Sequence, residues 1–361
     1  MSHAFGYAAQ SSSSPLAPFS FERREPREDD VVIKILYCGV CHSDIHQVRD
    51  EWGGSQYPMV PGHEIIGEVT AVGSNVTDFH VGEHVGVGCM VDSCQRCDAC
   101  QDGLEQYCAE FPTMTYGAVD RHDGTATQGG YSNHIVVDRH FVLHVPEGAD
   151  LPATAPILCA GITTWSPLRH YNVGKGHKVG VIGMGGLGHM GVKLAKALGA
   201  EVTLFTRSAK KAKEAFAQGA DHVIVSTDEA QMQAAADRFD FLLDTVPVQH
   251  DLNPYLATLR YDGVHILVGL IEPIEPALHA ANLVMKRRAV VGSLIGGIPE
   301  TQELLDFCAK HDITCDIEML DIQHINEGYE RMIKGDVKYR FVIDMASLEA
   351  ARQNVHSSAT A

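Results

Sequence analysis

Positive charge is scarce in this chain. Its 361 residues include 28 Lys and Arg against 46 Asp and Glu, which gives a formal net charge of −18. Such an excess of negative charge excludes binding to the phosphate backbone of nucleic acid as the main function, and it disfavours an anionic membrane surface as a partner. We therefore expect neither nucleic acid nor membrane among the partners.

Long apolar runs are also lacking. The uncharged run Leu151–Leu168 contains three prolines and falls short of the roughly 20 apolar residues that a membrane span needs. The first residues lack the basic segment followed by an apolar one that marks a signal peptide. We expect a cytoplasmic protein, whose ten cysteines serve as metal ligands or core residues rather than disulfides.

Four of these cysteines, Cys94, Cys97, Cys100 and Cys108, have the spacing C-x2-C-x2-C-x7-C. Four thiolates this close in sequence can surround one zinc ion tetrahedrally and leave no open coordination position. The spacing predicts a structural zinc lobe over about residues 89–110. An iron–sulfur cluster is the alternative, but the fourth spacing differs from the ferredoxin pattern and no proline follows Cys108.

A second cysteine pair, Cys38 and Cys41, forms the C-x-x-C-H pattern of c-type haem attachment. Haem attachment requires export, and the redox interpretation of C-x-x-C requires a thioredoxin-like context; the sequence supports neither. The segment Val31–Tyr37 is strand-like, so we expect Cys38 to point into the core at the strand end. We expect Cys41 to begin a polar turn, Cys41–Asp44, where it could bind a metal.

Two further residues could join Cys41 at a metal. His63 follows the Pro61–Gly62 turn and precedes an apolar strand, Ile65–Val72, while Cys159 lies in an apolar stretch. Cys41, His63 and Cys159 fit a three-ligand zinc site with an open fourth position. Spacing alone cannot join them, and a buried histidine or cysteine is often only a core residue.

A glycine-rich turn marks a dinucleotide site. The strand-like segment Lys178–Ile182 leads into G-x-G-x-x-G at Gly183–Gly188, followed by an amphipathic helix, His189–Leu198, and a second strand, Glu201–Thr206. Here Gly183 permits the turn, Gly185 lets the backbone approach a pyrophosphate, and Gly188 allows close packing of helix on strand. Gly186 and Leu187 complete the helix N-terminus at which the pyrophosphate binds.

The end of the second strand indicates which dinucleotide binds. NAD enzymes usually carry a carboxylate there, but this chain has Thr206, Arg207 and Ser208, followed by Lys210 and Lys211. A guanidinium can form paired hydrogen bonds with a 2′-phosphate, whereas a carboxylate would repel it. The segment predicts NADP(H) rather than NAD(H); the alternative is a solvated basic start of a helix.

The remaining segments alternate between strand and helix patterns, which predicts an α/β fold with a doubly wound parallel sheet. Expected strands are 222–225, 239–244, 264–268 and 289–292, and expected helices are 209–218 and 252–259, the latter stopped by Asp262–Gly263. We place a β-rich first domain at 1–154, a nucleotide domain at 155–295 and a C-terminal segment at 296–361. That last segment is expected to hold helices at 300–310 and 325–334 and a strand at 339–343.

The motifs together resemble those of the zinc-containing, medium-chain alcohol dehydrogenases. The resemblance is strongest to their cinnamyl alcohol dehydrogenase-like, NADP-dependent aldehyde reductase branch and spans residues 31–344. It rests on Cys41–Asp44, Gly62–Glu64, the four-cysteine lobe, Cys159–Thr163 and Gly183–Gly188, in that order. It implies a GroES-like β-barrel for the first domain, rejoined by the C-terminal segment, a Rossmann nucleotide domain, and a homodimer. One departure is Thr206–Ser208, where plant relatives often carry three serines.

The resemblance also implies roles for individual residues. Cys41, His63 and Cys159 would hold a catalytic zinc, the second of two per subunit, with Glu64 able to approach the metal. Asp44 would orient the histidine ligand, and Ser43 and His46 would relay protons. Further cofactor contacts are implied for a set of residues in both domains: His42, Thr163, Lys211, Ser293, Ile295 and Arg340.

The implied reaction is hydride transfer between NADPH and an aldehyde, either aromatic, such as cinnamaldehyde, or aliphatic, with zinc as Lewis acid. One alternative is a reductase of C=C or C=N bonds on the same scaffold. Another is a zinc- and nucleotide-binding protein without turnover. The presence of Ser43, His46 and the three ligands favours carbonyl chemistry.

Overall fold

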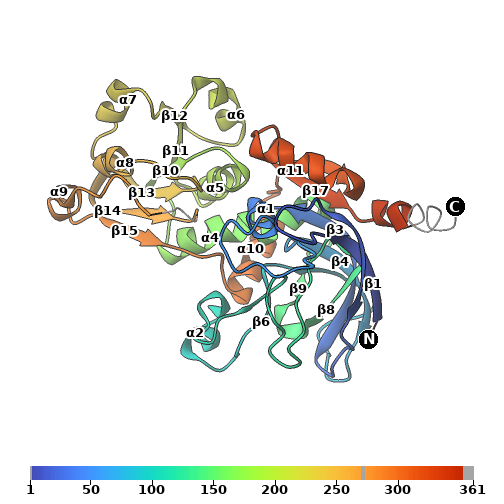
Figure 1. Cartoon of the computed structure of the whole chain (residues 1–361). Helices are drawn as coiled ribbons and strands as arrows, with labels where there is room; N and C mark the ends of the chain where they lie inside the picture. Colours follow the sequence, from blue (N-terminus) through green and yellow to red (C-terminus); the bar gives the residue numbers. More distant parts are fainter. Residues whose placement is uncertain (1, 270–272, 353–361) are drawn as a thin grey trace. The chain divides into compact units, whose positions relative to one another are not determined.

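The computed structural model describes residues 2–269 and 273–352, which fall into two compact units. The first unit contains the chain up to Cys159 and again from Gly296, and the second contains Ala160–Ile295. Figure 1 shows the elements of both units in the colours of the sequence. Among the described residues, no helix is long and apolar enough to cross a membrane.

The first unit is built on a seven-stranded sheet. Its strand order is β16-β17-β3-β4-β5-β9, and β8 also pairs with β3. The central strand β3 buries Val31, Ile33 and Ile35 on alternate positions, which is the period of a strand with one face on the core. The C-terminal strand β17 pairs antiparallel with β3, so the last part of the chain completes the sheet that the first part begins.

The strands of the first unit are β1 Ser2–Ala8, β2 Ala17–Arg23, β3 Asp30–Val40, β4 Ile65–Val72, β5 His84–Val87, β6 Met90–Asp92, β7 Thr113–Met114, β8 His134–Asp138, β9 Leu143–His144, β16 Ile317–Asp321 and β17 Arg340–Asp344. Its helices are α1 His42–Val48, α2 Asp98–Gln101, α3 Leu151–Thr154, α10 Ile298–Lys310 and α11 Ile325–Ile333.

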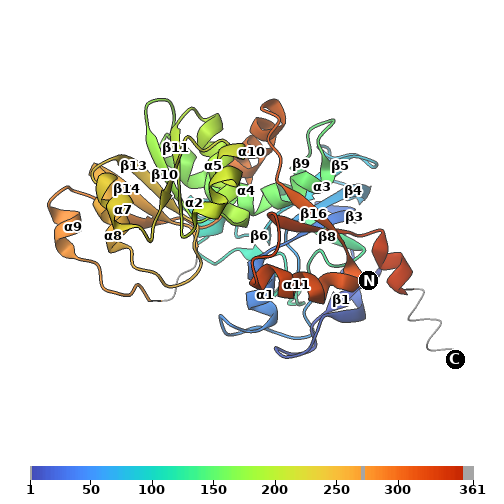
Figure 2. The same cartoon turned by 90° about the horizontal axis from the view of Figure 1, so that it is seen from above.

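The second unit is a parallel six-stranded sheet in the order β12-β11-β10-β13-β14-β15. The order reverses direction between β10 and β13, which is the switch point at which such sheets bind ligands. Figure 2 shows α7 and α8 on one side of this sheet and α5 on the other. Phe205 of β11 and Phe239 of β13 pack edge to face in its core, with ring centroids 5.3 Å apart.

The strands of the second unit are β10 Lys178–Ile182, β11 Glu201–Thr206, β12 His222–Val225, β13 Phe239–Asp244, β14 Leu259–Leu267 and β15 Ala289–Gly292. Its helices are α4 Ala160–His170, α5 Gly186–Ala197, α6 Ala212–Ala217, α7 Glu229–Ala234, α8 Asn253–Thr258 and α9 Ala280–Val284.

Two local predictions were wrong. The segment from Cys41 is not a polar turn: Cys41 caps the seven-residue helix α1, because the Asp44 carboxylate accepts the Cys41 N–H at 2.9 Å. Asp262–Gly263 does not end the preceding helix but lies inside β14. Asp262 takes a left-handed φ of 62°, and the pairing with β13 shifts register nearby, so the strand continues past the irregularity.

Candidate active site

The first unit brings together four residues that could hold a metal ion. One ligand atom from each of Cys41, His63, Glu64 and Cys159 lies within 4.8 Å of all the others, and all four residues are buried. The two Sγ atoms are 3.8 Å apart, and His63 Nε2 lies 3.3 Å from Cys159 Sγ. These are the residues that the sequence could not join by spacing.

Sheet pairing explains why Cys41 and His63 meet. Strands β3 and β4 are antiparallel, with Cys38 opposite Ile65. The residues just after β3 and just before β4 therefore lie at the same end of the sheet. Cys159 reaches them from the end of a 3₁₀ turn, η3 Ala155–Leu158, which packs against β3, β4 and β5.

The donor set fits zinc. Two thiols and an imidazole nitrogen are the ligands that zinc prefers, and a three-residue set keeps one position open for substrate. Both carboxylate oxygens of Glu64 are buried and have no hydrogen-bond partner among the described residues. The guanidinium of Arg340 lies 3.2 Å from Glu64 Oε1 and is the cation beside this carboxylate. The meeting of two thiols with an imidazole nitrogen is what supports a metal at this position.

Asp44 fixes the orientation of His63. Its carboxylate is fully buried and accepts the Cys41 N–H, the Gly62 N–H at 3.2 Å and the Tyr131 hydroxyl at 3.2 Å. It also lies 3.0 Å from His63 Nδ1, so that Nε2 faces the thiols. The resemblance implied this orienting role for Asp44, whereas nothing in the sequence indicated Tyr131.

Glu64 is paired with Arg340 inside the protein. Arg340 Nη1 lies 3.2 Å from Glu64 Oε1 and donates to the Val40 carbonyl at 3.2 Å. Burial raises the pKa of Glu64 to about 7, although the guanidinium opposes this shift. Strand β3 makes room with Gly39, where a β-carbon would lie 1.9 Å from Glu64 Oε2.

Arg340 also has spare donors: its Nε and Nη2 are buried and have no hydrogen-bond partner among the described residues. The contact of Arg340 with cofactor phosphate that the resemblance implies remains a prediction.

The two predicted relay residues lie on α1. Ser43 Oγ is 3.6 Å from Cys41 Sγ, and the side chain of His46 is 26% exposed. His46 Nδ1 contacts the Glu51 carboxylate, and its ring stacks on Trp52 with centroids 5.0 Å apart. Sequence reasoning missed Glu51, although a carboxylate five residues after His46 was a signal for it. The ring of His42, an expected cofactor contact, lies 6.4 Å from that of His46.

The four-cysteine lobe forms a second candidate metal centre. The sulfur atoms of Cys94, Cys97, Cys100 and Cys108 lie within 4.8 Å of one another. Backbone N–H groups point at these sulfurs: Ala109 donates to Cys97 Sγ at 3.4 Å, and Cys97 donates to Cys94 Sγ at 3.4 Å. The N–H of Ala109 is the main cause that lowers the pKa of Cys97 to about 6. Such donors favour the thiolate form that binds zinc.

In the second unit, the glycine turn has the shape that a dinucleotide needs. Gly183 has a φ of 93°, and a β-carbon at Gly188 would lie 2.1 Å from the Gly183 carbonyl oxygen. No atom lies within 4 Å of the β-carbon position at Gly185, so that side of the turn is open. Helix α5 begins at Gly186, earlier than predicted, so Gly186, Leu187 and Gly188 present N–H groups at a helix N-terminus.

The predicted phosphate-binding residues lie beside this turn. Lys211 Nζ donates to the carbonyl of Met184, inside the glycine turn, at 3.0 Å. Ser208 caps a 3₁₀ turn, η4 Ala209–Lys211, which precedes a shorter helix than the one predicted over 209–218. Arg207 is exposed, and Thr206 Oγ1 accepts the Ser208 N–H at 3.4 Å.

Three other expected cofactor contacts lie elsewhere in this unit. Thr163 is buried in α4, Ser293 follows β15 and donates its N–H to Leu267, and Ile295 has a φ of 34°. Their roles remain predictions.

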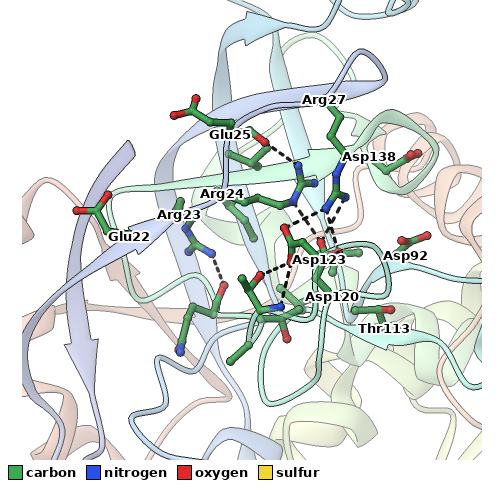
Figure 3. A pocket seen from close by; sticks show the side chains of 18 of the residues that line it. Glu22, Arg23, Arg24, Glu25, Arg27, Asp92, Thr113, Asp120, Asp123 and Asp138 are labelled. Carbon is green, nitrogen blue, oxygen red and sulfur yellow. Dashed lines mark hydrogen bonds and ion pairs between the residues drawn. The ribbon is translucent and has the colours of Figure 1, made fainter. Parts of the chain in front are cut away.

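A cavity of about 250 Å³ lies elsewhere in the first unit and contains none of the cysteines (Figure 3). Arg24 Nε and Arg27 Nη2 lie 3.2 and 3.0 Å from the Asp120 carboxylate, and Arg27 also pairs with Asp123. These ion pairs hold the segment that carries Asp120 and Asp123 to the chain after β2. Because these arginine and aspartate side chains neutralise one another, we assign this cavity a structural role.

Comparison with known proteins identifies the family. Residues 27–147 match the alcohol dehydrogenase GroES-like domain, and residues 186–310 match the zinc-binding dehydrogenase domain. The chain is 54% identical to aldehyde reductase YahK of Escherichia coli (strain K12), over 94% of this chain and 97% of that one. This chain belongs to the zinc-binding alcohol dehydrogenase family.

Other members of the family are nearly as similar. NADP-dependent alcohol dehydrogenase C 1 of Mycolicibacterium smegmatis is 52% identical over 97% of this chain and all of its own. The cinnamyl alcohol dehydrogenase SbCAD4 of Sorghum bicolor superposes with a TM-score of 0.92 and 45% identity, over 96% of this chain and 98% of that one. The predicted family and fold class, a GroES-like domain with a doubly wound nucleotide domain, are confirmed.

Proposed function

We propose that this alcohol dehydrogenase is a zinc-dependent, NADP(H)-linked enzyme that interconverts aldehydes and alcohols, with aromatic aldehydes such as cinnamaldehyde, and aliphatic ones, as substrates. The observation that carries the proposal is the buried cluster of Cys41, His63 and Cys159, with a carboxylate oxygen of Glu64 within 4.8 Å of their ligand atoms. Relatives named aldehyde reductase, NADP-dependent alcohol dehydrogenase and cinnamyl alcohol dehydrogenase support it. A similar solved structure, the CAD from Helicobacter pylori, is described as complexed with NADP(H).

Cys41, His63 and Cys159 would hold the catalytic zinc, which supplies a Lewis acid for the carbonyl oxygen, while NADPH supplies the hydride. Cys94, Cys97, Cys100 and Cys108 would hold the structural zinc. Asp44 would accept a hydrogen bond from the Nδ1–H of His63, which leaves the Nε2 lone pair free to bind the metal.

The proton that completes the alcohol needs a route from solvent. The partly exposed His46 can take a proton from water, and Glu51 stabilises its imidazolium and fixes the ring. Ser43 lies at the other end of the route, beside Cys41, where its hydroxyl can pass a proton to the product. The cofactor ribose would complete the route between them.

Cofactor choice would rest on the end of β11. We propose that the N–H groups of Gly186, Leu187 and Gly188 bind the pyrophosphate at the start of α5. Arg207, Ser208 and Lys211 would bind the 2′-phosphate. The contact between Lys211 and the Met184 carbonyl supports this, because it places an ammonium group next to the glycine turn.

The homodimer expected from the resemblance is also part of the proposal. Strand β15 is an edge of the second unit's sheet, and its residues are partly exposed, so its backbone could pair with the same strand of a second copy. Light scattering would test this. The cytoplasmic location expected from the sequence stays a prediction, which fractionation would test.

The function is tested by the initial rate of NADPH oxidation with cinnamaldehyde, compared with the rate with NADH. We expect fast turnover with NADPH, slow turnover with NADH, and cinnamyl alcohol as the product. A product reduced at the C=C bond would instead support a reductase of double bonds on this scaffold. A protein that carries two zinc ions but turns over no aldehyde with either cofactor would refute the proposal.

A further inference from the structure

A buried carboxylate at the carboxyl end of β13 holds two histidines. Asp244, the last residue of β13, is fully buried, and its Oδ2 lies 2.9 Å from Nε2 of both His250 and His265. Its other oxygen, Oδ1, accepts the N–H of Val246 at 3.2 Å. His265 comes from β14, whereas His250 comes from the segment that follows β13.

The partners of His250 determine its protonation. His250 Nδ1 lies 2.8 Å from the carbonyl oxygen of Val248, which can only accept a hydrogen bond, so Nδ1 carries a proton. Burial opposes ionisation of Asp244, but the two imidazoles outweigh it and hold the pKa of this carboxyl below its usual range. An ionised carboxylate is an acceptor as well, so an acceptor faces each ring nitrogen of His250. This geometry favours the imidazolium form, which has an N–H for each of them.

The other groups around His250 are compatible with a positive charge on its ring. Burial lowers the pKa of His250, but Asp244, with a smaller contribution from Asp251, raises it overall. The ring of Tyr255, from α8, meets the imidazole edge to face, with centroids 5.9 Å apart. A further carboxylate in this region, that of Glu275, accepts a hydrogen bond from the neighbouring Gln249 at 3.2 Å.

The segment held by His250, residues 245–250, packs on the glycine turn. Thr245 donates its N–H and its hydroxyl to the Ile182 carbonyl, at 3.1 and 2.8 Å. Val246 Cγ2 lies 3.0 Å from the β-carbon position at Gly183, and Thr245 Oγ1 lies 3.2 Å from that at Gly188. Segment 245–250 therefore forms a wall of the turn at the carboxyl edge of the sheet, where dinucleotides bind.

We propose that His250 is a positioning residue for the cofactor: its imidazolium pins segment 245–250 between Asp244 and Val248 and so holds the glycine turn in the shape that binds NADP(H). The proposal rests on the proposed NADP(H)-linked function. A neutral imidazole has one N–H and can satisfy only one of the two acceptors. Loss of the proton therefore loosens the segment, and cofactor affinity falls as the pH rises.

The test is fluorescence titration of the zinc-loaded enzyme with NADPH between pH 6.5 and 9. The variant His250→Gln should raise the Kd for NADPH at pH 7 by about tenfold, the expected consequence of losing one charge-assisted hydrogen bond. The Kd of the wild type should rise with pH, whereas the Kd of this variant should not depend on pH. The control His222→Gln, which removes an exposed histidine 3.4 Å from Glu201, should leave both unchanged.

A second variant keeps the test decisive if His250→Gln folds poorly. Asp244→Asn keeps the shape and an acceptor but removes the charge, so the pH midpoint of the Kd should move to a lower pH. A purely structural role would lower Tm without moving that midpoint. Unchanged Kd and midpoint in both variants overturn the inference and leave the proposed function intact, whereas a wild-type enzyme that binds no NADPH refutes the function itself.

Discussion

A buried carboxylate in the zinc lobe offers a prediction of stability that can be worked through. Glu105, in the 3₁₀ turn η1 Glu105–Tyr107, is fully buried. Its Oε2 accepts the N–H of Ile298 at 2.9 Å, and its Oε1 lies 2.8 Å from His140 Nε2. It therefore links the lobe to the first turn of α10. The variant Glu105→Gln retains the volume and an acceptor for Ile298 but removes the charge.

The magnitude follows from the hydrogen bond to His140. A charge-assisted hydrogen bond contributes about 1.5–3 kcal/mol. The imidazole is 42% exposed, so solvent screens part of this, and we expect a loss of about 1–2 kcal/mol. For a unit of this size each kcal/mol lowers Tm by about 2–4 °C, so Glu105→Gln should melt roughly 2–8 °C below the wild type.

The stability lost in Glu105→Gln should depend on pH. The hydrogen bond with Glu105 raises the pKa of His140. The charged form of His140 therefore contributes fully to stability below the pKa of histidine in the unfolded chain, about 6.5. This contribution disappears as the pH rises through the raised pKa of the folded state. Burial opposes ionisation of Glu105, but His140 and the Ile298 N–H lower its pKa. The ionised Glu105 carboxylate therefore contributes fully to stability above about pH 4.3, and this contribution disappears as the pH falls through its lowered pKa.

The difference between wild type and variant should therefore be largest between about pH 4.3 and 6.5. Thermal unfolding followed by circular dichroism at several pH values measures it. The control Glu110→Gln removes an exposed carboxylate that pairs with Arg96 in the same lobe and should change Tm little. An effect of Glu105→Gln that is the same at pH 5 and pH 9 would refute the reasoning.

Three further predictions concern the metal, the cofactor and the relay. Cys100→Ala should lose one zinc per chain and melt far below the wild type, because a structural zinc contributes about 10 kcal/mol or more of apparent binding energy; an unchanged Tm and zinc content would contradict it. Arg207→Asp should lower the preference for NADPH over NADH by at least about tenfold. Steady-state kinetics with both cofactors measures this preference, and an unchanged preference would contradict the prediction. Glu51→Gln should lower kcat by about threefold to tenfold with zinc content and Kd for NADPH unchanged; a full kcat would remove Glu51 from the relay.

Much of this architecture could be predicted because local sequence carries it. The glycine turn needs residues without a β-carbon at Gly183 and Gly188, and four nearby cysteines can reach one ion whatever surrounds them. The strands around the turn followed from short apolar segments, and five of them have the predicted bounds: 178–182, 201–206, 222–225, 239–244 and 289–292.

What local sequence could not supply was long-range pairing. Cys41 and Cys159 meet only because β3, β4 and η3 pack together. Tyr131, 87 residues from Asp44, and Arg340, far from Glu64 in sequence, join the site through the same sheet. The irregularity in β14 was missed because Asp262–Gly263 has the local sequence of a segment that ends a helix. In the structure, pairing with β13 continues on both sides of this dipeptide and keeps it inside the strand.

The central claim is that Cys41, His63 and Cys159 form a catalytic zinc centre, and Cys159→Ala tests it most directly. The measurement is the rate of NADPH oxidation with cinnamaldehyde by this variant, in protein shown to fold, to retain the lobe zinc and to bind NADPH. The account predicts one zinc per chain in place of two and no detectable turnover. A variant that keeps normal turnover would contradict it.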